Sequence, residues 1–307
     1  MATTPNAAGG NVALLRQLPR LARWLRTVNA PWLHAHYLTS HGLLAWLAQR
    51  VYGVGGRLIG SAWGSDILVT PERSALLRWA TRRVLRACAL TTSDSQVMAR
   101  RMQELGAAEV MVFPFGLEAM PAAPGPKAPA LFFANRGLEP IYAPQRVLQM
   151  FAALGWPEAR LVVANDGSLR AALEALAAEL GIAGQVQFVG RLDAAAQAVC
   201  YDRASWYLSL PQSDSVSVSV LEAMAHGCVP ILSDLSANRE LVSDGDNGVI
   251  LGDGERLTRD RLQPLAGRAG LVADANRAWV RDHALFAPSV QAFVARLRVI
   301  APVSFSA

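Results

Sequence analysis

Apolar runs of strand length alternate with amphipathic segments of helix length along this chain, and the alternation occurs twice. The first series predicts strands over residues 32–37, 56–62, 90–92 and 110–113, with helices over residues 11–28, 42–50, 74–89 and 95–105. The second series predicts strands over residues 131–134, 160–164 and 185–189, with helices over residues 144–154 and 169–180. Such alternation indicates α/β domains whose parallel sheets are joined by right-handed crossovers. The helix over residues 11–28 is expected to be interrupted at Pro19.

Four prolines within residues 119–129 mark the expected domain boundary. Clustered prolines are typical of an extended linker. We therefore predict a first domain over residues 1–118, a second over residues 130–285, and a C-terminal helix over residues 286–307 that could pack back on the first domain. In paired domains of this kind, ligands bind outside the carboxyl ends of the strands, in the cleft between the domains.

Bulk composition excludes several classes of protein. Hydrophobic residues make up 52% of the chain, but no apolar run reaches 18 residues, so no transmembrane helix is expected. The first ten residues lack the basic start and apolar core of a signal peptide. The three cysteines are far apart, which argues against a disulfide framework or a metal cluster. A reducing, cytoplasmic location is therefore expected.

Charge is distributed unevenly along the chain. Residues 1–120 carry 13 arginines and 6 acids, a net charge of +7, whereas residues 121–307 have a net charge of −2. Two explanations stand equally: an anionic partner such as a lipid headgroup, or codon bias toward arginine. The arginine-rich helix over residues 74–89 either has a solvated face or contacts anionic lipid. No nucleic-acid motif is present, so no nucleic-acid partner is expected.

Residues 211–230 are the segment of the chain that says most about ligand binding. Asp214 and Glu222 lie eight positions apart, separated by a run that alternates serine and valine, and Gly227 follows. Alternation alone is typical of a strand. The run, however, continues directly into a helix-forming segment, so we interpret residues 215–220 as a loop that enters a helix ending at Gly227. Such a loop can hold a phosphate on free N–H groups, or a sugar on its carboxylates.

An ordered series of motifs resembles the family 4 glycosyltransferases. The specific part is Glu-Ala-Met-Ala-His-Gly227 followed by a strand and then Asp-Gly-Asp-Asn-Gly248. Weaker matches lie at His34-Ala-His36, Trp63-Gly-Ser-Asp66, Ser93-Asp-Ser95, Asn135-Arg136 and Asn165-Asp-Gly167. The resemblance covers roughly residues 31–300. It implies the GT-B fold: two Rossmann-like domains with parallel sheets that face each other across a cleft.

The resemblance also implies roles for individual residues. Glu222 matches the second acid of the family's Glu-x7-Glu signature and would hold the two ribose hydroxyls of a nucleotide donor. Asp214 stands in the first position and would contact the donor sugar, while Arg136 would clamp the diphosphate. The remaining donor-binding candidates are Val216, Ser217, Val218, Ser219, Asp166 and Gly167.

Each of these residues also has a purely structural interpretation. A glutamate near a helix start is favoured by the macrodipole, which would account for Glu222 without any ligand. Asp214 could form an Asx turn, and Arg136 could lie on the surface. His34 and His36 are expected to be structural residues of a strand.

Three departures from the family pattern are visible. The lysine that usually accompanies Arg136 is missing, and Lys127, the only lysine of the chain, lies in the linker. Another arginine such as Arg191 could replace it. Trp63 stands where the family often has histidine, so Trp63 and Asp66 are acceptor-side candidates, although Asp66 could equally be a turn residue. Finally, roughly 60 residues of the family's opening have no counterpart, so the first domain is expected to be incomplete.

These observations predict a retaining glycosyltransferase that moves a sugar from a nucleotide diphosphate donor to a hydroxyl acceptor. The resemblance implies a lipid-linked or saccharide acceptor in envelope polysaccharide or glycolipid synthesis, at the inner face of the membrane. No metal and no cofactor other than the donor substrate are expected. The alternative is a non-catalytic donor-binding homologue or subunit. The shortened first domain and the missing lysine favour this alternative, and the intact Glu222 motif disfavours it.

Overall fold

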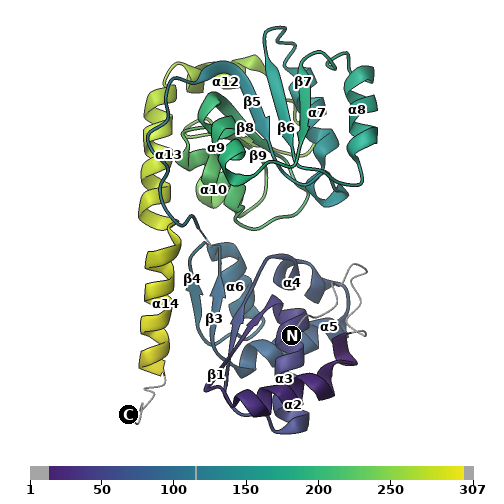
Figure 1. Cartoon of the computed structure of the whole chain (residues 1–307), viewed down its shortest axis with the longest axis vertical. Helices are drawn as coiled ribbons and strands as arrows, with labels where there is room; N and C mark the ends of the chain where they lie inside the picture. The colour runs from purple at the N-terminus through teal and green to yellow at the C-terminus, as the bar shows by residue number, and fades with distance from the viewer. Residues whose placement is uncertain (1–13, 115, 301–307) are drawn as a thin grey trace. The chain divides into compact units, whose positions relative to one another are not determined.

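The computed structural model describes residues 14–114 and 116–300, and the chain divides into two compact units (Figure 1). One unit comprises Met1–Val112 with Ala292–Ala307, and the other comprises Phe113–Gln291. Each unit contains its own parallel sheet, of four and six strands respectively, which confirms the predicted α/β class. Within the described ranges, no helix has both the length and the apolar character needed to cross a membrane.

The first unit is built on a sheet in which the strands follow one another in sequence order. Every neighbouring pair is parallel. The strands are β1 (Trp32–His36), β2 (Arg57–Ser61), β3 (Cys88–Ser93) and β4 (Val110–Val112). The helices are α2 (Leu18–Val28), α3 (Leu43–Tyr52), α4 (Ser65–Leu68), α5 (Ala75–Ala87) and α6 (Gln96–Glu104), with a π-helical turn over Tyr37–Gly42 and a 3-10 turn over Thr70–Glu72. Their apolar faces form one core with β1 and β2.

Local sequence explains where these helices begin. The hydroxyl of Ser95 accepts a hydrogen bond from the N–H of Met98 and caps α6, as the Ser93-Asp-Ser95 motif predicts. The predicted helix over residues 11–28 is interrupted as expected: residues 14–15 are helical, residues 16–17 form a turn, and Pro19 lies in the first turn of the new helix α2. A proline is tolerated there, since its missing N–H would have no partner inside the helix.

The C-terminal helix α14 (Phe286–Ile300) contributes its later residues to the first unit. Arg296 donates two hydrogen bonds of 2.6 Å to the carboxylate of Glu109, which lies just before β4. Arg57 on β2 donates to the carbonyl oxygen of Ile300 at 2.8 Å. These contacts attach residues 292–300 to the first residue of β2 and to the residue that precedes β4.

The second unit is built on a six-stranded parallel sheet in the order β10-β9-β8-β5-β6-β7. Its strands are β5 (Ala128–Ala134), β6 (Arg160–Ala164), β7 (Val186–Gly190), β8 (Ala204–Ser209), β9 (Val229–Ser233) and β10 (Val249–Leu251). The chain starts in the middle at β5, builds outward to β7, and then crosses back to place β8 on the other side of β5. This reversal is a topological switch point, where open α/β sheets bind ligands.

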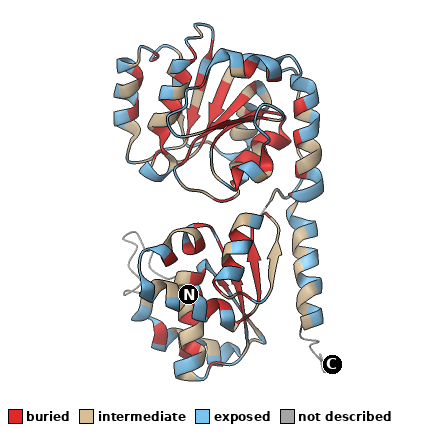
Figure 2. Cartoon of the chain, turned by 180° about the vertical axis from the view of Figure 1, so that it is seen from behind, coloured by how far each residue is buried: buried red, intermediate tan, exposed pale blue. Residues whose placement is uncertain are grey.

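Helices cover both faces of this sheet, and its strands are the most buried part of the unit (Figure 2). Consecutive residues alternate between the faces, so Phe132 belongs to one core and Phe133 to the other. The Phe132 core includes residues of α7 (Pro144–Ala153), α8 (Arg170–Glu179) and α12 (Arg259–Ala266). The Phe133 core includes residues of α9 (Ala194–Arg203), α10 (Val218–Ala225) and α11 (Asn238–Leu241), and α13 (Ala269–His283) contributes to both.

The proline-rich segment over residues 119–129 is attached to the second unit. Arg277 on α13 donates hydrogen bonds to the carbonyl oxygens of Pro121 and Ala122 at 3.1 and 3.3 Å. Lys127 donates to the carbonyl oxygens of Tyr201 and Ala204 at 2.7 and 3.0 Å. The last two residues of this segment already belong to β5.

Trp206 is the largest fully buried side chain of the structure, and its removal should destabilise the second unit. It is 2% exposed, stacks on Phe132, and donates its indole N–H to the carbonyl of Pro129 at 2.8 Å. We expect Trp206→Ala to lower the free energy of unfolding by about 3–5 kcal/mol, because it leaves a large cavity. Urea unfolding followed by circular dichroism measures the change.

Leu271→Ala provides the control in the same unit. Leu271 is 73% exposed on α13, so its truncation should change stability by less than about 0.5 kcal/mol. Equal effects of the two substitutions would contradict the described core.

Candidate functional site

Polar side chains gather at the carboxyl ends of β5 and β8, on either side of the switch point. Asn135 and Arg136 follow β5, and residues 211–217 follow β8 and lead into α10. Because β5 and β8 are hydrogen-bonded neighbours, these two loops leave the same edge of the sheet side by side. The loop after β6 joins them through a hydrogen bond from the Asn165 amide to the carbonyl of Asn135.

Arg136 is held in one orientation by four groups. Its Nη2 donates to Oδ2 of Asp214 at 2.6 Å, and its Nη1 donates to the hydroxyls of Ser217 and Ser219. The face of the guanidinium lies over the ring of Tyr142, 4.5 Å from the ring centroid. The structure thus brings Arg136 together with Asp214 of the loop and with Ser217 and Ser219 at the start of α10.

The Arg136–Asp214 ion pair is largely removed from water. The side chain of Arg136 is 18% exposed to solvent and that of Asp214 is 22% exposed. Burial raises the pKa of Asp214 above its ordinary value, and the attraction of Arg136 and the N–H of Ser215 only partly offset this effect. A buried pair of this kind is weak evidence for stability, because the desolvation of two charges costs about as much as their attraction returns.

Glu222 lies at the end of a network of buried polar side chains. The hydroxyl of Tyr201 donates to Oε2 of Glu222 at 2.9 Å and accepts from the amide of Asn135 at 2.7 Å. Asn135 also donates to Gln197 and accepts from the hydroxyl of Tyr207, both at 2.7 Å. Burial is the main cause that raises the pKa of Tyr201 far above its ordinary value, so this hydroxyl remains a donor.

Sequence reasoning missed Tyr201, Tyr207 and Gln197. They lie on α9 and β8, between 15 and 25 positions from Glu222, and no spacing rule links them to it. Only the packing of α9 and α10 on the same face of the sheet brings them together.

The loop after β8 enters α10 as predicted, and residues 215–217 form no strand. Ser217 is the N-cap residue, and the helix runs from Val218 to Ala225 before Gly227 adopts a φ of +75°. The N–H groups of Val218 and Ser219 have no acceptor inside the helix and carry part of the positive end of its dipole. Glu222 lies in the second turn, so the macrodipole at the helix start does not account for it.

Asp166 and Gly167 form the turn after β6. The carbonyl of Asp166 accepts from the N–H of Leu138 at 3.1 Å, which joins this turn to the loop after β5. A Cβ on Gly167 would lie 2.5 Å from the carbonyl oxygen of Leu138, so only glycine fits this close approach. Beside the turn lies a pocket of about 150 Å³ lined by Asn135, Ala164, Asn165, Arg191, Leu192 and Gln197.

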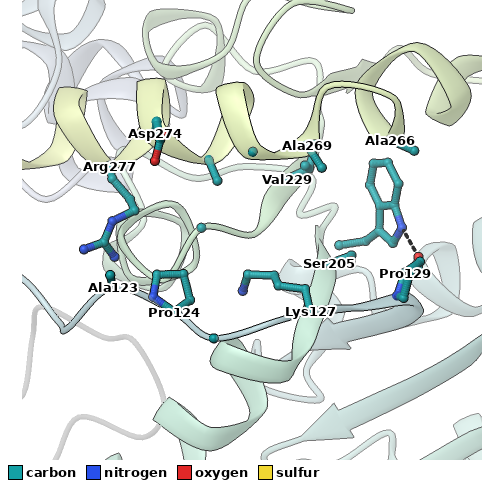
Figure 3. A pocket seen from close by; sticks show the side chains of 15 residues that line it. Ala123, Pro124, Lys127, Pro129, Ser205, Val229, Ala266, Ala269, Asp274 and Arg277 are labelled. Atoms are coloured by element: carbon teal, nitrogen blue, oxygen red, sulfur yellow. Dashed lines mark hydrogen bonds between the residues drawn. The ribbon is translucent and has the colours of Figure 1, made fainter.

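Lys127 directly precedes β5 and therefore lies at the amino ends of the strands, opposite the carboxyl ends where Arg136 lies. Figure 3 shows it beside the linker and α13, where it lines a cavity of about 450 Å³. Its ammonium donates to two backbone carbonyls and lies 3.6 Å from the sulfur of Cys228. The only lysine of the chain therefore serves to attach the linker, and it does not reach the site around Arg136.

In the first unit, aromatic side chains cluster at the carboxyl ends of β1 and β2. Trp63 donates its indole N–H to Nδ1 of His36 at 3.2 Å and stacks on Tyr37 with ring centroids 5.8 Å apart. Tyr37 and Trp63 are 43% and 39% exposed. Tyr37 adopts a φ of +62°, which is uncommon for a bulky residue and indicates local backbone strain.

Asp66 lies behind this cluster. It is 2% exposed, and its carboxylate accepts hydrogen bonds from the N–H groups of Leu38 at 2.8 Å and Trp63 at 2.9 Å. Burial raises its pKa, and these backbone bonds partly offset the effect. Asp66 therefore shapes the loop that presents Trp63, whereas the Trp63 ring itself reaches the surface.

His34 completes the cluster and bonds to Ser61 at 2.7 Å. Across residues 14–114 and 116–300, no group of three or more histidine, cysteine, aspartate or glutamate side chains could hold a metal ion.

Comparison with known families decides the assignment of this architecture. The model for glycosyl transferases group 1 matches residues 104–259, which is just over half of the chain. The chain belongs to this glycosyltransferase family. A second model, for the glycosyl transferase 4-like domain, matches residues 3–116. The two glycosyltransferase matches together span both units, which confirms the predicted family.

Individual relatives are distant. The chain is 30% identical over 130 residues to the GDP-mannose:cellobiosyl-diphosphopolyprenol alpha-mannosyltransferase of Xanthomonas campestris, covering 39% of this chain and 33% of that enzyme. It is 22% identical over 261 residues to the N-acetyl-alpha-D-glucosaminyl L-malate synthase of Bacillus anthracis, covering 80% of this chain and 68% of the relative. The match to the mannosyltransferase thus spans about a third of that enzyme's length.

Solved structures show the fold of the glycosyltransferase family. Anabaena HepE in complex with UDP superposes with a TM-score of 0.71 at 15% identity, covering 92% of this chain and 82% of HepE. At this level of identity the likeness concerns the fold alone. It confirms the predicted GT-B fold.

The histidines of the first unit should make its stability depend on pH. Burial and the neighbouring His36 lower the pKa of His34 to about 4, and burial together with His41 lowers the pKa of His36. The unfolded chain therefore binds more protons between pH 4 and about 6.5. We expect the first unit to lose stability as the pH falls through this range, as measured by urea unfolding at several pH values.

The variant His34→Asn/His36→Asn provides the comparison. It retains Asp66 and every other titrating group, so the difference between its pH profile and that of the wild type isolates the two imidazoles. Parallel profiles for the two proteins would show that the histidines have ordinary pKa values.

Proposed function

We propose that this protein transfers a sugar from a nucleotide diphosphate donor to a hydroxyl acceptor. The observation that carries the proposal is the convergence of Glu222 and the Arg136–Asp214 pair at the switch point of the second sheet. One carboxylate suited to a diol and one guanidinium suited to phosphate lie where a nucleotide binds in such sheets. The family supports the class of reaction.

Glu222 would hold the ribose. Tyr201 donates to Oε2 and fixes the orientation of the carboxylate, while Oε1 accepts no hydrogen bond from the described part of the chain. A carboxylate can accept from two neighbouring hydroxyls, and a ribose presents such a pair. The pocket of about 150 Å³ beside Asn135 would receive the base, and Asp166 and Gly167 shape the adjoining turn.

Arg136 and the start of α10 would bind the diphosphate. The guanidinium and the free N–H groups of Val218 and Ser219 place positive charge where the leaving phosphate develops negative charge. Arg191 lines the neighbouring pocket and is the second cation available to this site. It would assist in place of the lysine that the family usually has.

Asp214 would contact the donor sugar once a phosphate takes over part of the guanidinium. Its pairing with Arg136 keeps that cation neutralised until an anionic ligand arrives. In a retaining mechanism, the leaving phosphate oxygen accepts the proton of the acceptor hydroxyl as the new glycosidic bond forms on the same face of the sugar. The chain's own groups then act by orienting the donor and stabilising charge.

The exposed aromatic surface of Trp63 and Tyr37 would contact the acceptor. The face of an aromatic ring is electron-rich and packs on the C–H groups of a sugar ring. The mannosyltransferase relative acts on a cellobiosyl-diphosphopolyprenol, according to its name. We extend this class to the present chain and propose a lipid-linked saccharide acceptor in polysaccharide or glycolipid synthesis.

A peripheral contact with the membrane follows from that acceptor. Residues 1–112 and 292–307 carry 15 arginines against 5 acids, whereas residues 113–291 carry 14 basic residues against 19 acids. The exposed stripe of α5 combines apolar and basic side chains without an acid: Leu76, Trp79, Arg82, Arg83 and Arg86. Exposed tryptophan and leucine beside arginine favour contact with an anionic membrane surface over a face that is exposed to water alone. This contact would place the protein at the inner face of the membrane.

Glu222→Gln tests the assignment of the nucleotide site. We expect it to weaken the binding of UDP or GDP about 10- to 100-fold, because one hydrogen bond to a charged group contributes about 1.5–3 kcal/mol. Isothermal titration calorimetry measures the affinity. Glu179→Gln, an exposed glutamate on α8, removes the same charge elsewhere and should leave binding unchanged.

Transfer is tested separately from binding, with the nucleotide sugar and a lipid-linked saccharide as substrates. Product formation that is lost in Arg136→Ala supports catalysis at this site. Nucleotide binding without transfer or donor hydrolysis would instead identify a non-catalytic donor-binding homologue. The absence of any nucleotide binding by the wild-type protein would overturn the proposed site.

Vesicle binding tests the membrane contact. We expect the protein to bind phosphatidylglycerol vesicles and not phosphatidylcholine vesicles, and Arg82→Gln/Arg83→Gln to weaken binding about 30-fold, since each arginine near the surface contributes about 1 kcal/mol. Cosedimentation measures the bound fraction. The control Arg203→Gln/Arg281→Gln removes the same charge from the second unit. An equal loss in both variants would show that net charge, and not α5, governs binding.

A further inference from the structure

A second polar pocket lies next to the proposed nucleotide site, on the opposite side from the pocket for the base. It has a volume of about 550 Å³ and is formed where β8, β9 and β10 end, beneath α7. Following the sheet order, the carboxyl edge presents the small pocket at β5–β6–β7, then Arg136 and Asp214 between β5 and β8, and then this pocket. The proposed nucleotide therefore leaves it unoccupied.

The walls of this pocket are fixed by hydrogen bonds. Arg146 on α7 donates to the carbonyl oxygens of Leu251 and Gly252 at 2.9 and 2.6 Å, which joins the helix to the end of β10. Asp234 is held by two bonds from Arg239. The other charged groups of the wall are Asp253, which lies 3.5 Å from Arg146, Glu255, which accepts from Arg261, and Arg256.

Several neutral polar groups of the pocket are not engaged. Ser233 is 2% exposed, and its hydroxyl has no hydrogen-bond partner among the residues that the structure describes. The side-chain amides of Gln145, Gln149 and Gln212 likewise make no hydrogen bond within residues 14–114 and 116–300, and all three line the pocket. A buried hydroxyl without a partner costs about 1–3 kcal/mol, so its retention indicates a ligand that satisfies it.

The chemistry of these groups matches a carbohydrate. Amide and hydroxyl groups both donate and accept, as sugar hydroxyls do, and none of the four carries a charge. Met150 adds an apolar patch that can cover the C–H face of a sugar ring. We propose that this pocket is a saccharide subsite that binds sugar units of the acceptor away from the reacting hydroxyl.

The position of the pocket favours the acceptor over the donor sugar as its source. Gln212 lies two residues before Asp214, and its N–H donates to the carbonyl of Ile141, next to the Tyr142 ring that covers Arg136. The pocket thus continues directly from the proposed reaction centre, and it offers more room than a single pyranose ring needs. The assignment of the sugar to the acceptor rests on the proposed function, whereas saccharide binding itself does not.

Methyl NMR on the full chain observes this pocket without an activity assay. Protein labelled with [methyl-13C]methionine reports on Met150, assigned with the variant Met150→Leu. Cellobiose, maltotriose and a mannotriose serve as probes. We expect at least one of them to shift the Met150 signal saturably, while the signals of Met98 and Met102, buried in the first unit, remain in place. No shift of Met150 with any of these saccharides would overturn the proposal.

Two variants test the residues that carry the argument. Gln145→Ala/Gln149→Ala removes two amides from one face of α7 and should weaken saccharide binding about tenfold. The control Gln187→Ala removes an exposed amide from β7, far along the sheet, and should have no effect.

Ser233→Ala tests whether the unpaired hydroxyl of Ser233 binds a ligand or is only an unsatisfied group of the core. It removes a buried hydroxyl that has no partner, so the melting temperature should not fall, whereas saccharide affinity should drop several-fold. Unchanged affinity in this variant and in the glutamine variant would show that the pocket binds no sugar through these groups.

Donor binding is measured in parallel, so that failure of the proposed function is distinguishable. UDP and UDP-glucose are added separately. A shift of Met150 with UDP-glucose alone, and with no oligosaccharide, would assign the pocket to the donor sugar and overturn the acceptor subsite. Saccharide binding in a protein that fails to bind nucleotides would retain the subsite and reject the proposed transfer.

Discussion

The second unit depends on one topological constraint: its chain enters a wholly parallel sheet in the middle. Every strand then ends on the same edge, and the crossover from β7 back to β8 sends neighbouring loops toward opposite faces. The gap between the loops after β5 and β8 cannot be closed by strand pairing and is left to side chains. Arg136 comes from one loop and Asp214 from the other, so the fold itself brings the two charges together.

Burial of polar groups at this edge is costly, and the structure offsets the cost locally. The amide nitrogen of Asn135 donates to Tyr201 and Gln197, and its oxygen accepts from Tyr207. Tyr201 in turn donates to Glu222. A network that satisfies its own members is rigid, and a rigid carboxylate loses less entropy when a diol binds. The hydroxyl of Ser233, the last residue of β9, has no such partner among the described residues, and this contrast distinguishes the two polar regions of the edge.

Local rules predicted most of the fold and only part of the site. The positions of β1 to β7, the cap of α6 and the loop before α10 follow from periods and turn chemistry that act over a few residues, whereas β8 was not located in advance. The interruption next to Pro19 has the same local origin, because Pro19 has no N–H group to donate to the carbonyl of Leu15 and so cannot continue the helix from residues 14–15. Tyr201, Gln197 and the role of Asp66 behind Trp63 depend on packing between distant segments, which no local pattern contains.

The departures from the family signature form one consistent arrangement. The lysine that the resemblance leads one to expect is absent, so Arg136 is the cation that contacts this loop, and a guanidinium in a partly buried site needs a counter-charge close by. Asp214, one methylene shorter than the usual glutamate, pairs with Arg136 directly at 2.6 Å while Ser217 and Ser219 hold the other nitrogen. The short acid thus supplies the counter-charge that Arg136 needs where the lysine is missing. In the proposed mechanism, an incoming diphosphate would compete with Asp214 for the same guanidinium, so the strength of this ion pair would set both the affinity for the donor and the point at which Asp214 becomes available to the sugar.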